Sequence, residues 1–144
     1  PTWITPHLME FQRLFPFIQN TSLLEAAMEA ARLYGISVLL KGAHSVVAAP
    51  NGITWQIDGT VPWVARAGLG DLLAGFVAGT GALAMASEKE ISSSSLVSAA
   101  LVHAEAAKKC DLGTSSSSIA GCMSRLVKTI QSRDPDIRTF KCNK

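Results

Sequence analysis

The residues best suited to chemistry form a short glycine-rich turn. Gly68 and Gly70 flank Leu69, and Asp71 follows directly, ahead of an apolar run that predicts a helix to about residue 86. Glycine permits unusual backbone angles and a close approach of a ligand to the main chain. The first turn of a helix presents unpaired N–H groups and a partial positive charge, so the turn is predicted to bind phosphate or another anion.

Asp71 has two interpretations in this position. An aspartate beside a helix N-terminus stabilises the helix as a cap. It can also orient a substrate hydroxyl and accept its proton, while backbone amides stabilise charge on a transferring phosphoryl group. The turn taken alone leaves both interpretations open.

A second polar group follows a predicted strand at residues 36–40, whose continuous apolar run is typical of a strand buried on both faces. Lys41, Gly42 and Ala43 then turn the chain. A lysine at a strand end can reach a nucleotide phosphate as a point charge, or it can simply face solvent. His44 beside it is interpreted as structural more readily than as catalytic.

Two other histidines differ in setting. His7 lies at a strand-to-helix junction, where it could hydrogen-bond a polar substrate or cap the helix start. Glu10, one turn later, could pair with Arg13 at the i+3 position. His103 lies on an apolar face of a predicted helix and is interpreted as a satisfied structural histidine.

The elements around these residues follow an alternating pattern. A strand end at residues 2–5 precedes a short helix that starts at Thr5-Pro6, and a capping-box pattern at Ser22 predicts a helix ending at Gly35. Further predicted elements are strands at 45–49 and 53–57 around an Asn51-Gly52 turn, an Asp58-Gly59 turn, helices at 96–110 and 119–130, and serine runs at 92–95 and 115–118 read as a linker, loops or caps. This order favours a layered α/β fold with the glycine-rich turn at the edge of a sheet.

Gly75 and Gly79 lie inside the predicted helix that follows the turn. They are four residues apart and share one face, which predicts a close approach to a neighbouring element.

Composition limits the class of protein. The chain has 144 residues, 48% of them hydrophobic and 17% charged, which fits one compact domain or part of a larger one. A net charge of +2 gives no argument for nucleic-acid binding. The basic C-terminal stretch is interpreted as a solvated tail, with polyanion binding as the alternative.

No apolar run is expected to reach the ~18 residues of a membrane span. Three cysteines without a CxxC spacing argue against a disulfide framework or a zinc site, so a cytoplasmic location is expected.

Three segments, in this order and spacing, resemble the NAD(P)H-hydrate dehydratase family, which belongs to the ribokinase-like superfold. They are residues 4–10, 40–45 and 67–75. The resemblance covers roughly residues 1–110, and residues 111–144 form a weakly matched helix and basic tail. It implies a three-layer α/β/α fold of which residues 1–144 are a single partial domain, the C-terminal half. A missing N-terminal segment or a second copy of the chain is then expected to complete it.

The same resemblance implies repair of damaged nicotinamide cofactors, by dehydration of NADH or NADPH hydrate with ADP or ATP consumed and Mg²⁺ on the phosphates. Asp71 would act as the base and contact the substrate, together with His7. The nucleotide would be held by Lys41, Gly42, Ala43, His44, Ser45, Gly68 and Gly70. The sequence around these segments is similar to that of bacterial members, which favours ADP. No metal ligand is assigned to the chain.

Three departures from the family pattern keep other functions open. Leu8-Met9 replaces a usual Pro-Gly, Leu69 replaces a usual serine or threonine, and His44-Ser45 replaces a common Gly-Thr. The alternatives are another ribokinase-like kinase for a small hydroxylated metabolite, and an inactive nucleotide-binding remnant.

Overall fold

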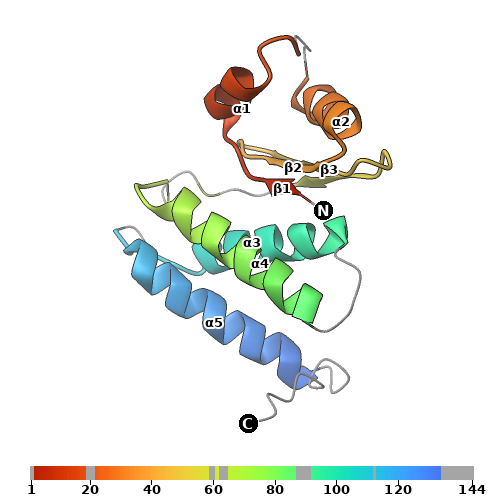
Figure 1. Ribbon diagram of the computed structural model, residues 1–144. Coiled ribbons are helices and arrows are strands. Elements are labelled where there is room, and N and C mark those ends of the chain that lie inside the picture. The colour runs from red at the N-terminus through yellow and green to blue at the C-terminus, as the bar shows by residue number, and fades with distance from the viewer. Residues whose placement is uncertain are drawn as a thin grey trace.

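The computed structural model describes residues 2–18, 22–58, 61, 65–86, 92–111 and 113–133. Its elements are β1 (Trp3–Ile4), α1 (Leu8–Leu14), α2 (Leu23–Tyr34), β2 (Ser37–Leu40), β3 (Ser45–Ala48), β4 (Thr54–Ile57), α3 (Leu69–Ala86), α4 (Ser93–Lys108) and α5 (Ser116–Arg133). Helices α1 and α2 cover one face of the sheet, α3 and α4 lie against the other, and α5 packs outside them (Figure 1). The expected α/β/α layering is confirmed.

The sheet has the order β1-β2-β3-β4, with β1 parallel to β2 and the other neighbours antiparallel. Strand β2 is buried along its whole length, as its apolar run predicts. The β3–β4 hairpin turns at Asn51-Gly52, where Gly52 has a φ of +86° that suits glycine. The loop at residues 41–45 therefore connects the end of β2 to the start of the β3–β4 hairpin.

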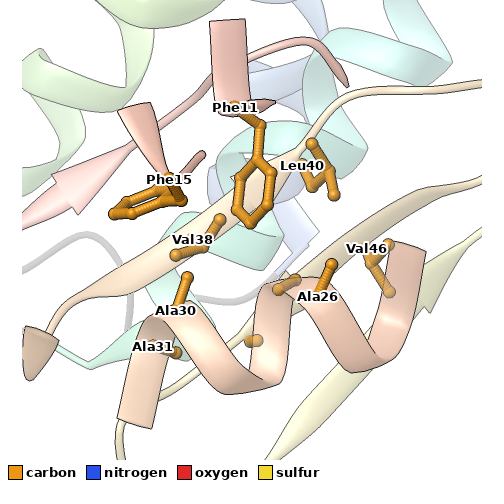
Figure 2. Close-up of a cluster of buried hydrophobic side chains, with 10 residues drawn as sticks. Phe11, Phe15, Ala26, Ala30, Ala31, Val38, Leu40 and Val46 are labelled. Atoms are coloured by element: carbon orange, nitrogen blue, oxygen red, sulfur yellow. The ribbon is translucent and has the colours of Figure 1, made fainter. Parts of the chain in front are cut away.

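One core lies between the sheet and helices α1 and α2 (Figure 2). Phe11 of α1 and its C-cap residue Phe15 pack with Val38 and Leu40 of β2. The ring centroids of Phe11 and Phe15 are 4.9 Å apart. Helix α2 meets the sheet through small side chains, so its backbone lies close to the strands: Ala26, Ala27, Ala30 and Ala31. This packing fixes β2 from one side.

The predicted limits of α2 are confirmed. Ser22 is its N-cap, and the Ser22 Oγ accepts a hydrogen bond of 3.1 Å from the Glu25 N–H. Gly35 ends the helix in the left-handed conformation, with a φ of +63°.

The second core lies on the opposite face of the sheet. Leu39 and Val47 of the strands pack with Leu73 and Val77 of α3 and with Leu96 of α4. A third cluster joins α4 to α5 and contains Ala106, Ala107, Cys110, Ile119 and Met123. Helix α4 therefore contacts both the sheet and α5.

The serine runs are partly corrected. Ser92 is the N-cap of α4, as the cap interpretation allows, but residues 93–95 belong to the helix rather than to a linker. Residues 116–118 likewise form the first turn of α5. Serine hydroxyls can bond first-turn backbone groups, which makes such runs compatible with a helix start. Helix α1 begins two residues later than expected, with His7 as its N-cap.

The expected close approach at Gly75 and Gly79 is wrong. A Cβ added to either residue would meet nothing within 4 Å. The close approach is instead at Gly81, where an added Cβ would lie 3.3 Å from the Trp3 ring. The glycines share a face, but that face of α3 is exposed.

Helix α3 also corrects the expectation about membrane-spanning length. Among the described residues it is the one helix long and apolar enough to cross a membrane by length and composition. A single such helix is weak evidence, and Leu73 and Val77 pack α3 onto the sheet.

Some sequence-based predictions lie outside the described residues. These are the Gly59 half of the Asp58-Gly59 turn and the basic tail at residues 134–144.

The α3 glycines give a stability prediction. Gly79→Ala should raise the melting temperature by a few degrees, because alanine favours a helix interior by about 1 kcal/mol and the site is open. Gly81→Ala should raise it less, because Trp3 must give way. Thermal unfolding followed by circular dichroism measures both, and equal gains would contradict the tight contact at Gly81.

Candidate functional site

A cavity of about 570 Å³ lies between the loop that follows β2, the start of α3 and one face of α4. The polar side chains in its wall come from His7, Lys41, Ser45, Arg66 and His103. The rest of the wall is apolar or glycine, with Leu39, Gly42, Ala43, Ile57, Val61, Ala65, Leu69, Gly70, Leu73, Ala100, Ala104 and Ala107. The cavity thus combines an apolar interior with a few polar groups, as small-molecule sites do.

Lys41 reaches across this cavity to the glycine-rich turn. Its backbone continues the parallel pairing of β1 and β2, since the Lys41 N–H donates to the Pro6 carbonyl at 2.9 Å. Its Nζ lies only 3.2 Å from where a Cβ on Gly70 would stand. A Cβ at position 70 would require the ammonium to give way by a few tenths of an ångström, so glycine allows Lys41 its closest approach to the first turn of α3.

The turn itself has the predicted geometry. Gly68 has a φ of +82°, and its carbonyl accepts from the Leu72 N–H at 2.9 Å as α3 begins. Asp71 lies in the first helical turn and is exposed. Unpaired N–H groups at a helix N-terminus and a lysine ammonium together form a site for an anion. Gly70 lines the cavity, whereas Gly68 and Asp71 lie beside it.

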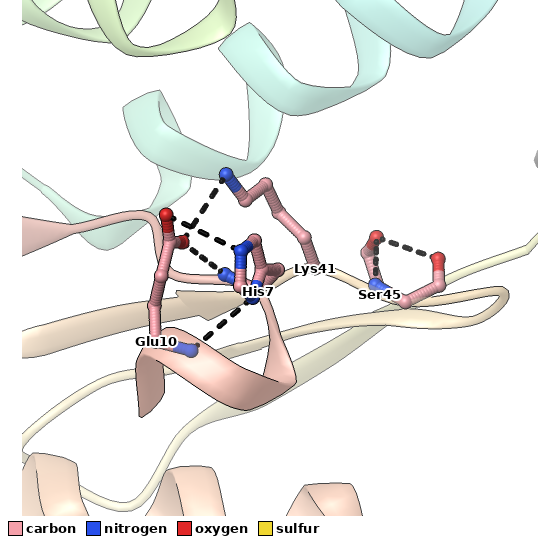
Figure 3. A network of polar contacts seen from close by, with 5 residues as sticks. His7, Glu10, Lys41 and Ser45 are labelled. Carbon is pink, nitrogen blue, oxygen red and sulfur yellow. Dashed lines mark hydrogen bonds and ion pairs between the residues drawn. The ribbon is translucent and has the colours of Figure 1, made fainter. Parts of the chain in front are cut away.

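The loop at residues 41–45 is closed by Ser45. The Ser45 Oγ accepts from the Gly42 N–H and donates to the Gly42 carbonyl, both at 3.3 Å (Figure 3). This bracing presents Gly42, Ala43 and Ser45 to the cavity.

His44 is the member of this loop that the structure does not bring to the cavity. Its Nδ1 lies 2.9 Å from Asp58 Oδ1, which also accepts a 2.9 Å bond from Gln56 Nε2. The Gln56 bond, with the His44 contact second, lowers the pKa of Asp58. His44 thus contacts Asp58, which follows β4, in agreement with its interpretation as a structural histidine.

His7 caps α1 and shares Glu10 with Lys41. The His7 Nδ1 accepts from the Glu10 N–H at 3.2 Å, and the Glu10 carboxylate accepts from the His7 N–H at 2.8 Å (Figure 3). The same carboxylate lies 3.9 Å from Lys41 Nζ and 3.4 Å from His7 Nε2. The His7 N–H, and to a lesser degree Lys41, lower the pKa of Glu10. Glu10 therefore pairs across the cavity edge, rather than with Arg13 as expected.

His103 is the cavity residue whose place sequence reasoning missed. Its Nε2 is buried and has no hydrogen-bond partner among the described residues, while the ring hydrogen-bonds to the Leu69 backbone, so the histidine is only partly satisfied. Burial lowers the pKa of His103, and the positive charge of Lys41 lowers it further. A hydrogen bond to the Leu69 backbone acts in the opposite direction and raises that pKa, but the net shift is downward. An apolar helix face gave no signal that this side chain meets the glycine-rich turn.

Comparisons with known proteins agree on one family. A family model described as NAD(P)H-hydrate dehydratase matches residues 1–131. The bifunctional NAD(P)H-hydrate repair enzyme of Synechocystis sp. is 48% identical over 79 residues, which cover 55% of this chain and 15% of that enzyme. The ADP-dependent (S)-NAD(P)H-hydrate dehydratase of Nitrosopumilus maritimus is 38% identical over 80 residues, 53% of this chain and 27% of that enzyme.

Solved structures share the fold. The ADP/ATP-dependent NAD(P)H-hydrate dehydratase of Bacillus subtilis, co-crystallised with ATP and Mg²⁺, has a TM-score of 0.74 at 23% identity, over 90% of this chain and 48% of that one. A ribokinase-like superfamily protein of Enterococcus faecalis also has a TM-score of 0.74, at 24% identity, over 88% and 44%. The ribokinase-like fold is confirmed, and the chain spans about half the length of these structures.

The buried ring of His103 predicts a pH effect on stability. The ordinary pKa of histidine is 6.5, and above that pH the ring is neutral in both the folded and the unfolded chain. Below that pH the unfolded chain binds a proton on His103, whereas the folded chain, in which the pKa is lowered, does so less readily. Stability should therefore fall as the pH drops from about 7 to 5, and His103→Gln should flatten that part of the profile. Melting temperature against pH measures this, with the exposed His44→Gln as the matched control. A His103→Gln profile parallel to that of the unmodified chain would contradict the assignment.

Proposed function

This chain belongs to the NAD(P)H-hydrate dehydratase family, and on that premise we propose that it provides the nucleotide-binding and base-bearing part of an enzyme that dehydrates NAD(P)H hydrate with ADP or ATP consumed. The observation that carries the proposal is the position of Lys41 Nζ against Gly70, one residue before Asp71. Lys41 Nζ and the first-turn N–H groups of α3 support a phosphate there, and Asp71 follows in the same turn.

The nucleotide phosphates bind at this point in the proposal. The first turn of α3 offers N–H groups, and Lys41 turns from Glu10 to a phosphate oxygen. An ion pair of 3.9 Å between exposed or half-exposed side chains is weak, so the exchange costs little. The Gly42–Ser45 bracing shapes the adjoining wall, and Mg²⁺ would accompany the phosphates. The Nitrosopumilus relative is an ADP-dependent enzyme, and the Bacillus enzyme was co-crystallised with ATP and Mg²⁺. Both findings support an adenine nucleotide at this site.

Asp71 is the proposed base. It is exposed at the helix start, where a hydroxyl on the hydrated nicotinamide ring can reach it. Accepting the hydroxyl proton lets that oxygen attack the terminal phosphoryl group of the nucleotide. The bond between that phosphoryl group and the rest of the nucleotide breaks, and the shortened nucleotide leaves. The ring C–O bond then breaks with loss of phosphate, and a proton leaves the neighbouring ring carbon, which restores the double bond of the reduced nicotinamide.

His7 is the proposed substrate contact, at the edge of the same cavity. Its Nδ1 is engaged by the Glu10 N–H, which leaves Nε2 to exchange the Glu10 carboxylate for the hydrate. His44 and Gly68 remain predicted nucleotide ligands, His44 with its ring held by Asp58.

We also propose that a further polypeptide segment, or a second copy of this chain, completes the domain. Among the described residues β1 pairs with β2 alone. A groove of about 370 Å³ adjoins it, lined by Trp3 and by the exposed face of α3. Apolar side chains such as Leu83 and Met85 lie exposed on α3, which favours a covered face in the full assembly. A cytoplasmic location is part of the same proposal.

Asp71→Asn tests the base. With NADH or NADPH hydrate, Mg²⁺ and ADP or ATP, recovery of the reduced-nicotinamide absorbance should slow by about 10²–10⁴-fold, while nucleotide affinity changes little. Asp111→Asn, an exposed aspartate away from the cavity, is the control. A stable phosphorylated product would instead indicate a kinase. Nucleotide binding without turnover, unchanged in Asp71→Asn, would indicate an inactive remnant.

Lys41→Met tests the phosphate contact independently of turnover. Loss of a charge-assisted hydrogen bond should weaken ADP and ATP binding by about 10–100-fold. Isothermal titration calorimetry of the Mg²⁺ nucleotides measures this, with Lys128→Met on the exposed face of α5 as control. Equal affinity in both variants would remove Lys41 from the site.

A further inference from the structure

Two thiols from different helices face each other at the junction of α4 and α5. Cys110 follows the end of α4 and Cys122 lies in α5, and their Sγ atoms are 3.5 Å apart. Both are free thiols. Cys110 belongs to the cluster that joins the two helices, and Cys122 packs against it. Side-chain rotation can close such a contact to the ~2.05 Å of a disulfide without separating the helices.

The two thiols have different surroundings. Cys122 is half-buried, and its Sγ accepts hydrogen bonds from Arg125 Nη2 at 3.0 Å and from Cys110 Sγ. The Arg125 guanidinium can therefore donate to the Cys122 sulfur while that sulfur reacts. Cys110 is buried, and its one S–H is shared between the Ala106 carbonyl, at 3.1 Å, and Cys122 Sγ. Burial, with Cys122 second, raises the pKa of the Cys110 thiol, so Cys110 stays protonated.

A metal site is a poorer account of the same pair. In the part of the chain that the structure describes, no group of three or more His, Cys, Asp or Glu side chains could hold a metal ion. Two thiolates alone leave a zinc ion short of its usual four ligands. A dithiol without further ligands is suited to oxidation rather than to metal binding.

We propose that Cys110 and Cys122 are a redox-active pair, which a peroxide oxidises to a disulfide and a thiol reductant restores. The Cys122 thiolate attacks one peroxide oxygen, the O–O bond breaks, and hydroxide leaves to give a Cys122 sulfenic acid. The Cys110 sulfur then attacks the Cys122 sulfur. Its proton leaves with the sulfenic hydroxyl as water, and the S–S bond forms. Two thiols are oxidised by two electrons, and hydrogen peroxide is reduced to two waters.

The disulfide would fasten α5 beside the glycine-rich turn. The Ser116 Oγ, at the start of α5, lies 3.5 Å from where a Cβ on Gly68 would stand. Helix α4 provides His103 and Ala107 to the cavity wall. A bond between Cys110 and Cys122 closes a short loop and holds these parts together, so oxidation stabilises the folded chain. The inference rests on the thiol geometry and not on the proposed dehydration.

The first test counts thiols in a Cys142→Ser variant, because Cys142 lies outside the described residues. After treatment with hydrogen peroxide and then iodoacetamide, the tryptic peptide of residues 110–125 should lose the mass of two hydrogens and take up no alkyl group. Dithiothreitol should restore double alkylation. The melting temperature should be roughly 5–10 °C higher in the oxidised form.

Single-cysteine variants in the same Cys142→Ser background are the matched controls. With Cys110→Ser, Cys122 should stop at a sulfenic acid that dimedone traps. With Cys122→Ser, the buried Cys110 should stay unoxidised at the same peroxide concentration. Arg125→Met should slow disulfide formation without preventing it. Cross-linked dimers on a non-reducing gel, or further oxidation of Cys122 while Cys110 stays open to alkylation after unfolding, would overturn the proposal.

Discussion

The site depends on the packing of one ammonium group against one glycine. Because position 70 has no side chain, Lys41 Nζ lies close against the first turn of α3 without having to shift. A cation beside the positive end of a helix is unfavourable by itself, so the arrangement needs an anion. Glu10, at 3.9 Å, is the nearby carboxylate that serves in this structure. Glu10 therefore offsets part of the charge of Lys41, although a pair at this distance between partly exposed side chains is weak.

The fold explains why these two elements meet. Parallel pairing of β1 with β2 continues to the His7–Lys41 bridge, so both strand ends place a polar residue at one edge of the sheet. Clusters on both faces hold β2 rigidly, and the second of them includes Leu73 of α3. Leu73 packs on the sheet, and the glycine-rich turn lies one helical turn before it in α3. The position of Leu73 therefore holds that turn next to Lys41. The precision of the site therefore comes from burial rather than from the loops themselves.

Local signals in the sequence predicted most elements. Ser22 and Gly35 mark the limits of α2, and Asn51-Gly52 marks the hairpin, because caps and turns depend on neighbouring residues alone. Which face a helix presents depends on its partners, and there the sequence was misleading. Gly75 and Gly79 share a face that meets no described neighbour, and His103 lies on a face that meets the cavity. The family resemblance implies that Lys41 and Gly70 hold the same nucleotide, but no local signal predicts that they lie against each other, since the two residues belong to separate elements.

The uneven use of the polar loop residues has a common physical reason. His44 and Ser45 adjoin each other at the start of β3, and successive side chains of a strand point to opposite faces. Ser45 turns inward to Gly42, so His44 must turn outward, where it meets Asp58 at the far end of the hairpin. A ligand in the cavity can thus contact the wall formed by Gly42, Ala43 and Ser45 without disturbing the His44 pair. The loop's shape is set by the hairpin before any ligand binds, which is what a preorganised anion site requires.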